Sequence, residues 1–126
     1  METYLSVALG GALGSMARYA TGVYVGRWLG TAFPWGTLAI NIIGSFLIGA
    51  FAESFALRWD ASPSTRVFLV VGICGGYTTF STFSLDIVTL INRGEFLAAG
   101  AYIAASVVLG VVALYAGLHA MRLVFT

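Results

Sequence analysis

Four long stretches of the chain are almost entirely apolar, and each is long enough to cross a lipid bilayer as a helix. They cover residues 4–25, 35–57, 63–92 and 96–125. A membrane-spanning helix needs about 20 mostly apolar residues. Only 9% of the residues are charged, against about 25% in soluble domains, so the chain cannot cover a water-facing surface. We therefore predict an all-α integral membrane protein, with residues 1–126 forming a single four-span membrane domain.

The third stretch contains a segment that weakens a helix at its middle. Within residues 75–79, two adjacent glycines precede a tyrosine and two adjacent threonines, which are poor helix formers. We predict a break there, between helical residues 63–74 and 80–92. Unwound backbone at membrane depth persists only where it is buried in protein or lines a cavity. Its carbonyls can hold a cation, and the new helix N-terminus can attract an anion. An unbroken helix that uses the glycines for packing is the alternative.

The charged residues give no clear orientation in the membrane. Positively charged loops normally face the cytoplasm, and all six basic residues are arginines. With four spans, one side of the membrane would carry Arg58, Arg66 and Arg122. The other side would carry Arg27 and Arg93, and Arg18 would be embedded in the membrane nearer to that side. A chain without orientation bias can insert both ways and pair head to tail, so the tally leaves dual topology open. The alternative is that other determinants set one orientation.

Hydrogen-bonding side chains repeat at helical spacing along three of the stretches. They are Thr37, Asn41 and Ser45 in the second, Thr79, Thr82 and Asp86 in the third, and Tyr102 and Ser106 in the fourth. An isolated serine or threonine in a membrane helix usually bonds to its own backbone. Asn41 cannot be satisfied in that way and is costly when it faces lipid. It therefore either bridges helices or lines a polar route.

The balance of embedded groups favours an anion as the transported species. A proton-coupled cation transporter normally needs an acid at membrane depth, but Glu53 and Asp86 lie toward the ends of their stretches, and Arg18 is the only charge in the first. Phe80 and Phe83, three residues apart, share a helix face. The edges of their rings carry the positive part of the aromatic quadrupole and can contact a small anion. Packing of both rings in the core is the alternative.

Other functional classes find little support in the sequence. Cys74 is the only cysteine and His119 the only histidine, so a multi-cysteine metal site is excluded. No Ser-His-acid set is apparent, and the sequence contains no phosphate-binding loop motif. The net charge of +1 offers no basic face for nucleic acid. We expect no enzyme activity and no organic cofactor, and we assign no role to Tyr77, Asp86 or His119.

Three motifs together identify a family. They are Gly75-Gly76-Tyr77-Thr78-Thr79-Phe80-Ser81-Thr82-Phe83-Ser84, Gly10-Gly11-x-x-Gly14-x-x-x-Arg18-Tyr19 and Gly36-Thr37-x-x-x-Asn41. With them, the whole chain resembles the Fluc (CrcB) fluoride channels. The resemblance implies an antiparallel homodimer in the bacterial inner (plasma) membrane, with two pores and a structural sodium ion at its centre. It also implies passive export of fluoride from the cytoplasm, which reduces fluoride toxicity.

The resemblance also implies roles for individual residues. Phe80 and Phe83 would meet fluoride along the pore, and Asn41 would line it. The backbone carbonyls of Gly75 and Thr78, two from each subunit, would hold sodium. The remaining pore positions are Ser81, Thr82, Thr37, Tyr102 and Ser106, and Arg18 would have a structural or vestibule position.

Two alternatives belong to other classes. A small multidrug-resistance-type transporter also has four spans in an antiparallel dimer, but it needs a glutamate within the first span, where this sequence has none. A structural subunit of a larger membrane complex would not need the embedded polar lines.

Overall fold

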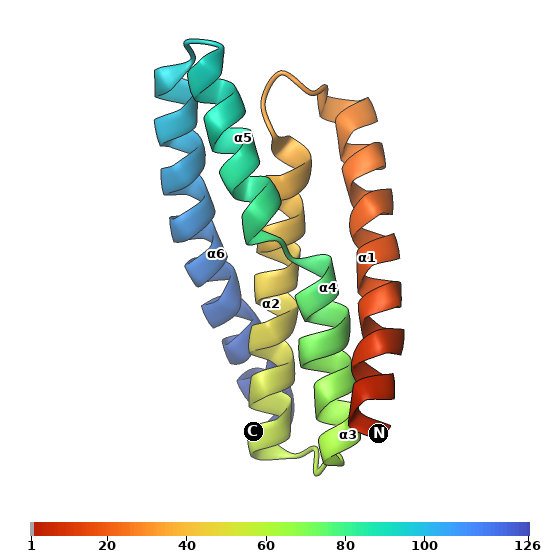
Figure 1. The fold of residues 1–126 in the computed structure, drawn as a ribbon. Helices are drawn as coiled ribbons and strands as arrows, with labels where there is room; N and C mark the ends of the chain where they lie inside the picture. Colours follow the sequence, from red (N-terminus) through yellow and green to blue (C-terminus); the bar gives the residue numbers. More distant parts are fainter. Residues whose placement is uncertain (1) are drawn as a thin grey trace.

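The computed structural model describes residues 2–126 as a set of long helices packed side by side, with no β-strand in that part of the chain (Figure 1). The all-α prediction is therefore confirmed. In chain order the elements are α1 (Glu2–Leu29), α2 (Trp35–Leu57), α3 (Pro63–Arg66), the π-helical segment η1 (Val67–Cys74), α4 (Gly75–Tyr77), α5 (Phe80–Asn92) and α6 (Phe96–Phe125).

The chain runs up and down the long axis of the molecule, so that both termini lie at the same end (Figure 1). Within residues 2–126, three segments are long and apolar enough to cross a membrane: Trp35–Leu57, Pro63–Asn92 and Phe96–Phe125. At 28 residues, α1 is long enough, about 42 Å at 1.5 Å per residue, but it is less apolar than the other three. These segments are those of a membrane protein.

The residues that connect the long helices also mark where the helices begin and end. Gly30 and Gly94 have φ angles of 82° and 77°, a conformation that glycine adopts at little cost. Ser62 caps α3, because its hydroxyl accepts a hydrogen bond from the backbone N–H of Thr65 at 3.2 Å, and Pro63 occupies the first helical position. These start and stop signals place the short connections between the long helices at the two ends of the molecule (Figure 1).

The third span is interrupted at Thr78 and Thr79, which both have extended backbone with ψ angles of 157° and 122°. This break is shorter than the predicted one over residues 75–79, because Gly75 and Gly76 are helical. Gly76 serves packing instead: a Cβ atom there would lie 2.8 Å from the carbonyl oxygen of Gly11 in α1. The threonines therefore form the break, and a glycine brings it close to α1.

Backbone contacts through glycine bring the long helices together. A Cβ atom at Gly72 in η1 would lie 2.8 Å from the Cα atom of Gly10 in α1. Between α2 and α6, a Cβ atom at Gly117 would meet the carbonyl oxygen of Phe46, and one at Gly49 would meet the backbone of α6. Small residues at such positions allow close helix approach in membranes.

Replacing Gly117 by alanine is expected to destabilise the protein by about 1–3 kcal/mol, because the added methyl group meets backbone that cannot move aside. Thermal unfolding of the full chain in detergent measures the effect as a lower Tm. The matched control is Gly100→Ala on the same helix, where an added Cβ atom meets nothing within 4 Å; this change should leave Tm equal or raise it. Equal Tm values for the two variants would contradict the packing argument.

Candidate functional site

Asn41 on α2 holds the broken backbone of the third span. Its side-chain Nδ2 donates a hydrogen bond to the carbonyl oxygen of Thr79 at 3.1 Å, and its Oδ1 accepts one from the backbone N–H of Thr79 at 2.9 Å. Both backbone groups of Thr79 are therefore satisfied by one side chain from a neighbouring helix. Of the two expectations for Asn41, the bridging of helices is seen directly.

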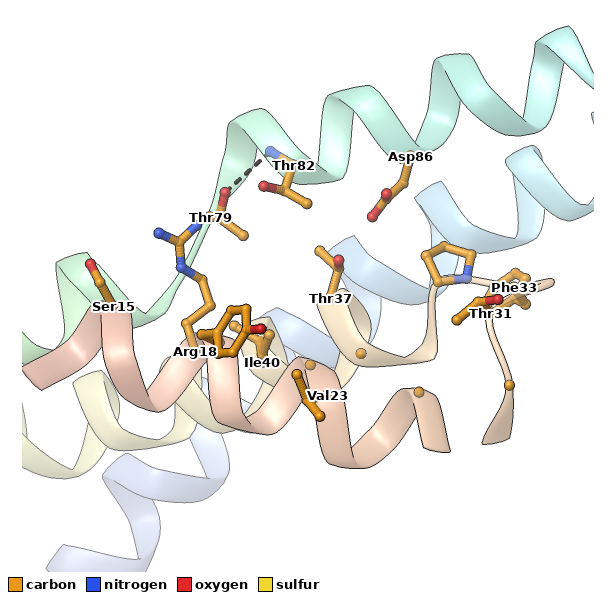
Figure 2. Close-up of a pocket in the computed structure, with 16 residues that line it drawn as sticks. Ser15, Arg18, Val23, Thr31, Phe33, Thr37, Ile40, Thr79, Thr82 and Asp86 are labelled. Atoms are coloured by element: carbon orange, nitrogen blue, oxygen red, sulfur yellow. Dashed lines mark hydrogen bonds between the residues drawn. The ribbon is translucent and has the colours of Figure 1, made fainter. Parts of the chain in front are cut away.

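The two threonines of the break bond to the helices on either side of it. The Thr79 hydroxyl accepts a hydrogen bond from the backbone N–H of Thr82 at 3.1 Å and so caps the N-terminus of α5 (Figure 2). The Thr78 hydroxyl donates to the carbonyl oxygen of Cys74 at 2.9 Å. Local side-chain bonds of this kind compete with a continuous helix.

These bonds leave two carbonyl oxygens without their helical donors. In an unbroken helix, the N–H of Thr79 would donate to the carbonyl of Gly75, and the N–H of Thr82 to that of Thr78. Here the two N–H groups donate to Asn41 and to the Thr79 hydroxyl instead. Carbonyl oxygens freed by an unwound membrane helix can coordinate sodium.

A cavity of about 330 Å³ lies on one side of the break. Ser106 of α6 lies against it, and its hydroxyl oxygen is buried with no hydrogen-bond partner in the described part of the chain. Buried polar atoms nearly always have a partner, so this hydroxyl is available to a ligand. The cavity is lined by Asn41, Ser45, Ile48, Thr78, Thr79, Phe80, Phe83, Ser106 and Val107.

The two phenylalanine rings at this cavity differ in their surroundings. Their centroids lie 5.7 Å apart. The Phe80 side chain is 78% exposed in the isolated chain, so packing within one protomer does not explain it. Phe83 is half-buried, and its ring centroid lies 5.0 Å from that of Tyr102. Packing within the protomer therefore explains part of the position of the Phe83 ring, but it explains little of the position of the Phe80 ring.

A larger cavity of about 650 Å³, which Thr79 also lines, is formed between α1, α2 and α5 (Figure 2). Figure 2 shows Arg18 of α1 beside Thr79, with Asp86 farther along α5 beyond Thr82. Within residues 2–126 the ion pairs are Arg93 with Glu95 and Arg122 with Glu53, so Arg18 forms none there. The cavity therefore contains, close to the break, a guanidinium that forms no ion pair with the described residues.

The structure separates the predicted pore residues into three groups. Tyr102 is fully buried and donates a hydrogen bond to a carboxylate oxygen of Asp86 at 3.0 Å, and Ser81 is exposed on α5; neither lines either of these two cavities. Thr37 and Thr82 line the larger cavity. The smaller cavity brings together Asn41, Phe80, Phe83 and Ser106.

Thr79 lies in the predicted break and in a predicted polar line, but sequence reasoning assigned it no specific role in the site. It lines both cavities, bonds to Asn41 through its backbone and caps α5 through its hydroxyl. A threonine immediately before a helical run is a known N-cap signal, and that signal could have identified it. Its contact with Asn41 joins positions 38 residues apart and has no local signature.

Comparison with known proteins gives a consistent result across almost the whole chain. The sequence profile described as "CrcB-like protein, Camphor Resistance (CrcB)" matches residues 5–118. The "Fluoride-specific ion channel FluC" of Nitrobacter winogradskyi is 62% identical over 120 residues, 95% of each chain. The "Fluoride-specific ion channel FluC 1" of Nitrobacter hamburgensis is 64% identical over 118 residues, 94% of each. The FluC of Rhodospirillum centenum is 52% identical over 122 residues, 97% of each.

Proposed function

This chain belongs to the CrcB family of fluoride ion channels, which are not enzymes, and we propose that it lets fluoride leave the cytoplasm passively. Fluoride enters a cell as neutral HF and is trapped inside as the anion, which the membrane potential then drives outward. The observation that carries the proposal is the buried, unpartnered hydroxyl of Ser106, which lines the same cavity as Phe80. The match to channel relatives leaves the drug-transporter alternative without support.

The smaller cavity offers an anion several weak positive groups and no fixed negative charge. The helix α5 starts at its edge, and the N–H groups of a first helical turn carry partial positive charge. The Ser106 hydroxyl can donate a hydrogen bond, and the ring edges of Phe80 and Phe83 are electropositive. Together these groups can replace part of the hydration shell of a small anion.

Asn41 has a remaining donor after it has bonded to the break. A side-chain amide carries two N–H hydrogens, and the carbonyl oxygen of Thr79 takes one of them. Since Asn41 also lines the smaller cavity, the other hydrogen is left for an ion there. Asn41 thus both bridges two helices and lines the proposed route.

The larger cavity would serve as a vestibule in which anions collect. Arg18 supplies positive potential, and the hydroxyls of Thr37 and Thr82 offer hydrogen bonds. The carboxylate of Asp86 is directed to Tyr102 through one of its oxygens, which reduces the negative potential that it adds to the cavity. The potential near the break is therefore dominated by the guanidinium.

A sodium ion at the break also belongs to the proposal. The carbonyl oxygens of Gly75 and Thr78 have lost their helical donors, and such oxygens fit a cation of this kind. Two from each subunit would hold the ion at the centre of a dimer. When bound, the ion supplies positive charge close to the vestibule.

We further propose that α1 is the fourth membrane span and that two copies pair in antiparallel orientation in the bacterial inner membrane. The exposed apolar side chains of α1 support a position against lipid or a second copy; they include Leu5, Leu9, Leu13 and Met16. The exposed ring of Phe80 and the nearly equal arginine tally support pairing of inverted copies.

Dual topology predicts that a tag on the C-terminus is reachable from both faces of the membrane in one expressed population. A membrane-impermeant thiol reagent, used on intact cells and then on opened cells, measures the two fractions for a chain with a cysteine in the tag. Cys74 is buried and remains as the untagged control. Labelling from one face only would contradict the dual-topology proposal.

The proposed activity is tested by fluoride efflux from liposomes that contain the purified chain. With a potassium ionophore to balance charge, fluoride should leave rapidly and chloride should remain inside. Protein-free liposomes give the background. Fluoride efflux no faster than that background would overturn the proposed function.

A further inference from the structure

We infer that Tyr77 is a positioning residue, whose hydroxyl bond to Thr21 of α1 fixes the Thr78 carbonyl in the place where a cation is held. The inference rests on the sodium site in the proposed function. It concerns Tyr77, to which neither the sequence nor the proposed ion route assigns a role.

The hydroxyl of Tyr77 makes a defined contact across the molecule. It lies 2.9 Å from the hydroxyl oxygen of Thr21. Thr21 donates its own hydroxyl hydrogen to the carbonyl oxygen of Ala17, also at 2.9 Å. Since a hydroxyl has only one hydrogen to donate, Tyr77 is the donor and Thr21 the acceptor. This hydrogen bond joins the last residue of α4 to α1.

The tyrosine has little freedom to move around this bond. Its side chain is buried between neighbouring helices, with 7% of the residue exposed. A Cβ atom at Gly44 of α2 would lie 3.4 Å from Cδ2 of the ring, and one at Gly14 of α1 would lie 2.9 Å from the backbone nitrogen of Tyr77. Two glycines thus bring α1 and α2 against this residue. The bond of its hydroxyl to Thr21 then fixes the end of the side chain.

The residues on the two sides of Thr78 are held by different helices. Tyr77 is tied to Thr21 of α1, and Thr79 is tied to Asn41 of α2. The carbonyl of Thr78, which has no helical donor, lies between these two anchors. Binding groups must be held within about 0.5 Å of their productive positions by such supporting bonds. Loss of the Tyr77 anchor should therefore weaken cation binding before it weakens the fold.

The test compares Tyr77→Phe with the unchanged chain. Thermal unfolding of the full chain in detergent is followed over a series of sodium concentrations, with N-methylglucamine replacing sodium at constant ionic strength. A ligand that binds the folded state raises Tm as its concentration passes its dissociation constant. For Tyr77→Phe, the sodium midpoint, which is the concentration that fills half of the sites and is read from the onset of the Tm rise, should increase about fivefold, the effect of one net hydrogen bond.

Two further variants make the result specific. Thr21→Val removes the acceptor with little change in volume, and it should shift the sodium midpoint by a similar factor; it also replaces Tyr77→Phe if that variant does not fold. The double variant should show no larger shift than either single one. Tyr115→Phe on α6, where the exposed ring stacks on His119, is the matched control and should keep the midpoint unchanged.

The outcomes separate this inference from the proposed function. If Tyr77→Phe lowers Tm equally with and without sodium and keeps the midpoint, the hydroxyl is only structural and the inference is overturned. If sodium does not change the Tm of the unchanged chain, the cation site and the inference both fail, whereas fluoride efflux still tests the channel. A sodium-responsive chain without fluoride efflux overturns the channel alone.

Discussion

Replacing Phe80 by isoleucine should reduce fluoride efflux about tenfold or more while leaving the amount and stability of folded protein unchanged. The ring is 78% exposed in the protomer, so its loss removes little packing within the chain. Isoleucine keeps the apolar character and removes the electropositive ring edge. A tenfold loss corresponds to about 1.4 kcal/mol of lost stabilisation of the ion on its route.

The measurement is efflux normalised to the dimer recovered from gel filtration. Phe96→Ile is the matched control, because Phe96 is also exposed, at 66%, and lines neither cavity. Phe83→Ile should reduce flux as well, with an added stability cost of up to about 1.5 kcal/mol from its contact with Tyr102. Unchanged flux in both the Phe80 and Phe83 variants would leave the rings with a packing role only.

Replacing Asn41 by aspartate should abolish fluoride efflux. The new carboxylate would place a negative charge in the smaller cavity, and two like charges about 4 Å apart repel by about 4 kcal/mol at an effective dielectric constant of about 20. That energy corresponds to a loss of about a thousandfold. The change also replaces the donor that faces the carbonyl oxygen of Thr79 by an acceptor, so the break loses one of its two bonds to α2.

Measuring efflux and Tm on the same preparations separates the effect of the added charge from the effect of the lost hydrogen bond. Asn41→Ala removes both bonds without adding charge, and it should lower Tm at least as much as aspartate while keeping more flux. Asn92→Asp, at the exposed end of α5, controls for the added charge. Thr37→Ala and Ser45→Ala, one turn away on α2, should cause smaller losses, because water can replace a hydroxyl. Efflux in Asn41→Asp within about threefold of the unchanged chain would contradict the anion route.

Helix positions could be predicted closely from the sequence, because they follow from local signals. α2 and α6 begin and end at the residues expected from hydropathy, and the third span ends at Asn92. α1 runs past the expected residues 4–25 at both ends, since hydropathy detects the apolar middle of a helix, whereas Gly30 ends this one. The resemblance to the fluoride channels is likewise confirmed by relatives that cover nearly the whole chain.

The extent of the break and the partners of its residues could not be predicted in the same way. Glycine weakens a helix at any position, and only the close approach of Gly11 shows that Gly76 serves packing. The bonds from Asn41 to Thr79 and from Tyr77 to Thr21 join residues 38 and 56 positions apart. Such contacts depend on how the helices pack, and no local pattern encodes them.

Both termini lie at one end of the protomer, so its two ends differ in structure (Figure 1). In the proposed antiparallel dimer, a twofold axis in the plane of the membrane exchanges those ends, so the assembly presents identical faces to the cytoplasm and to the outside. Any tendency of one pore to pass current more easily in one direction is matched by the opposite tendency of its inverted neighbour. The assembly as a whole cannot rectify, and the direction of net flow comes entirely from the electrochemical gradient.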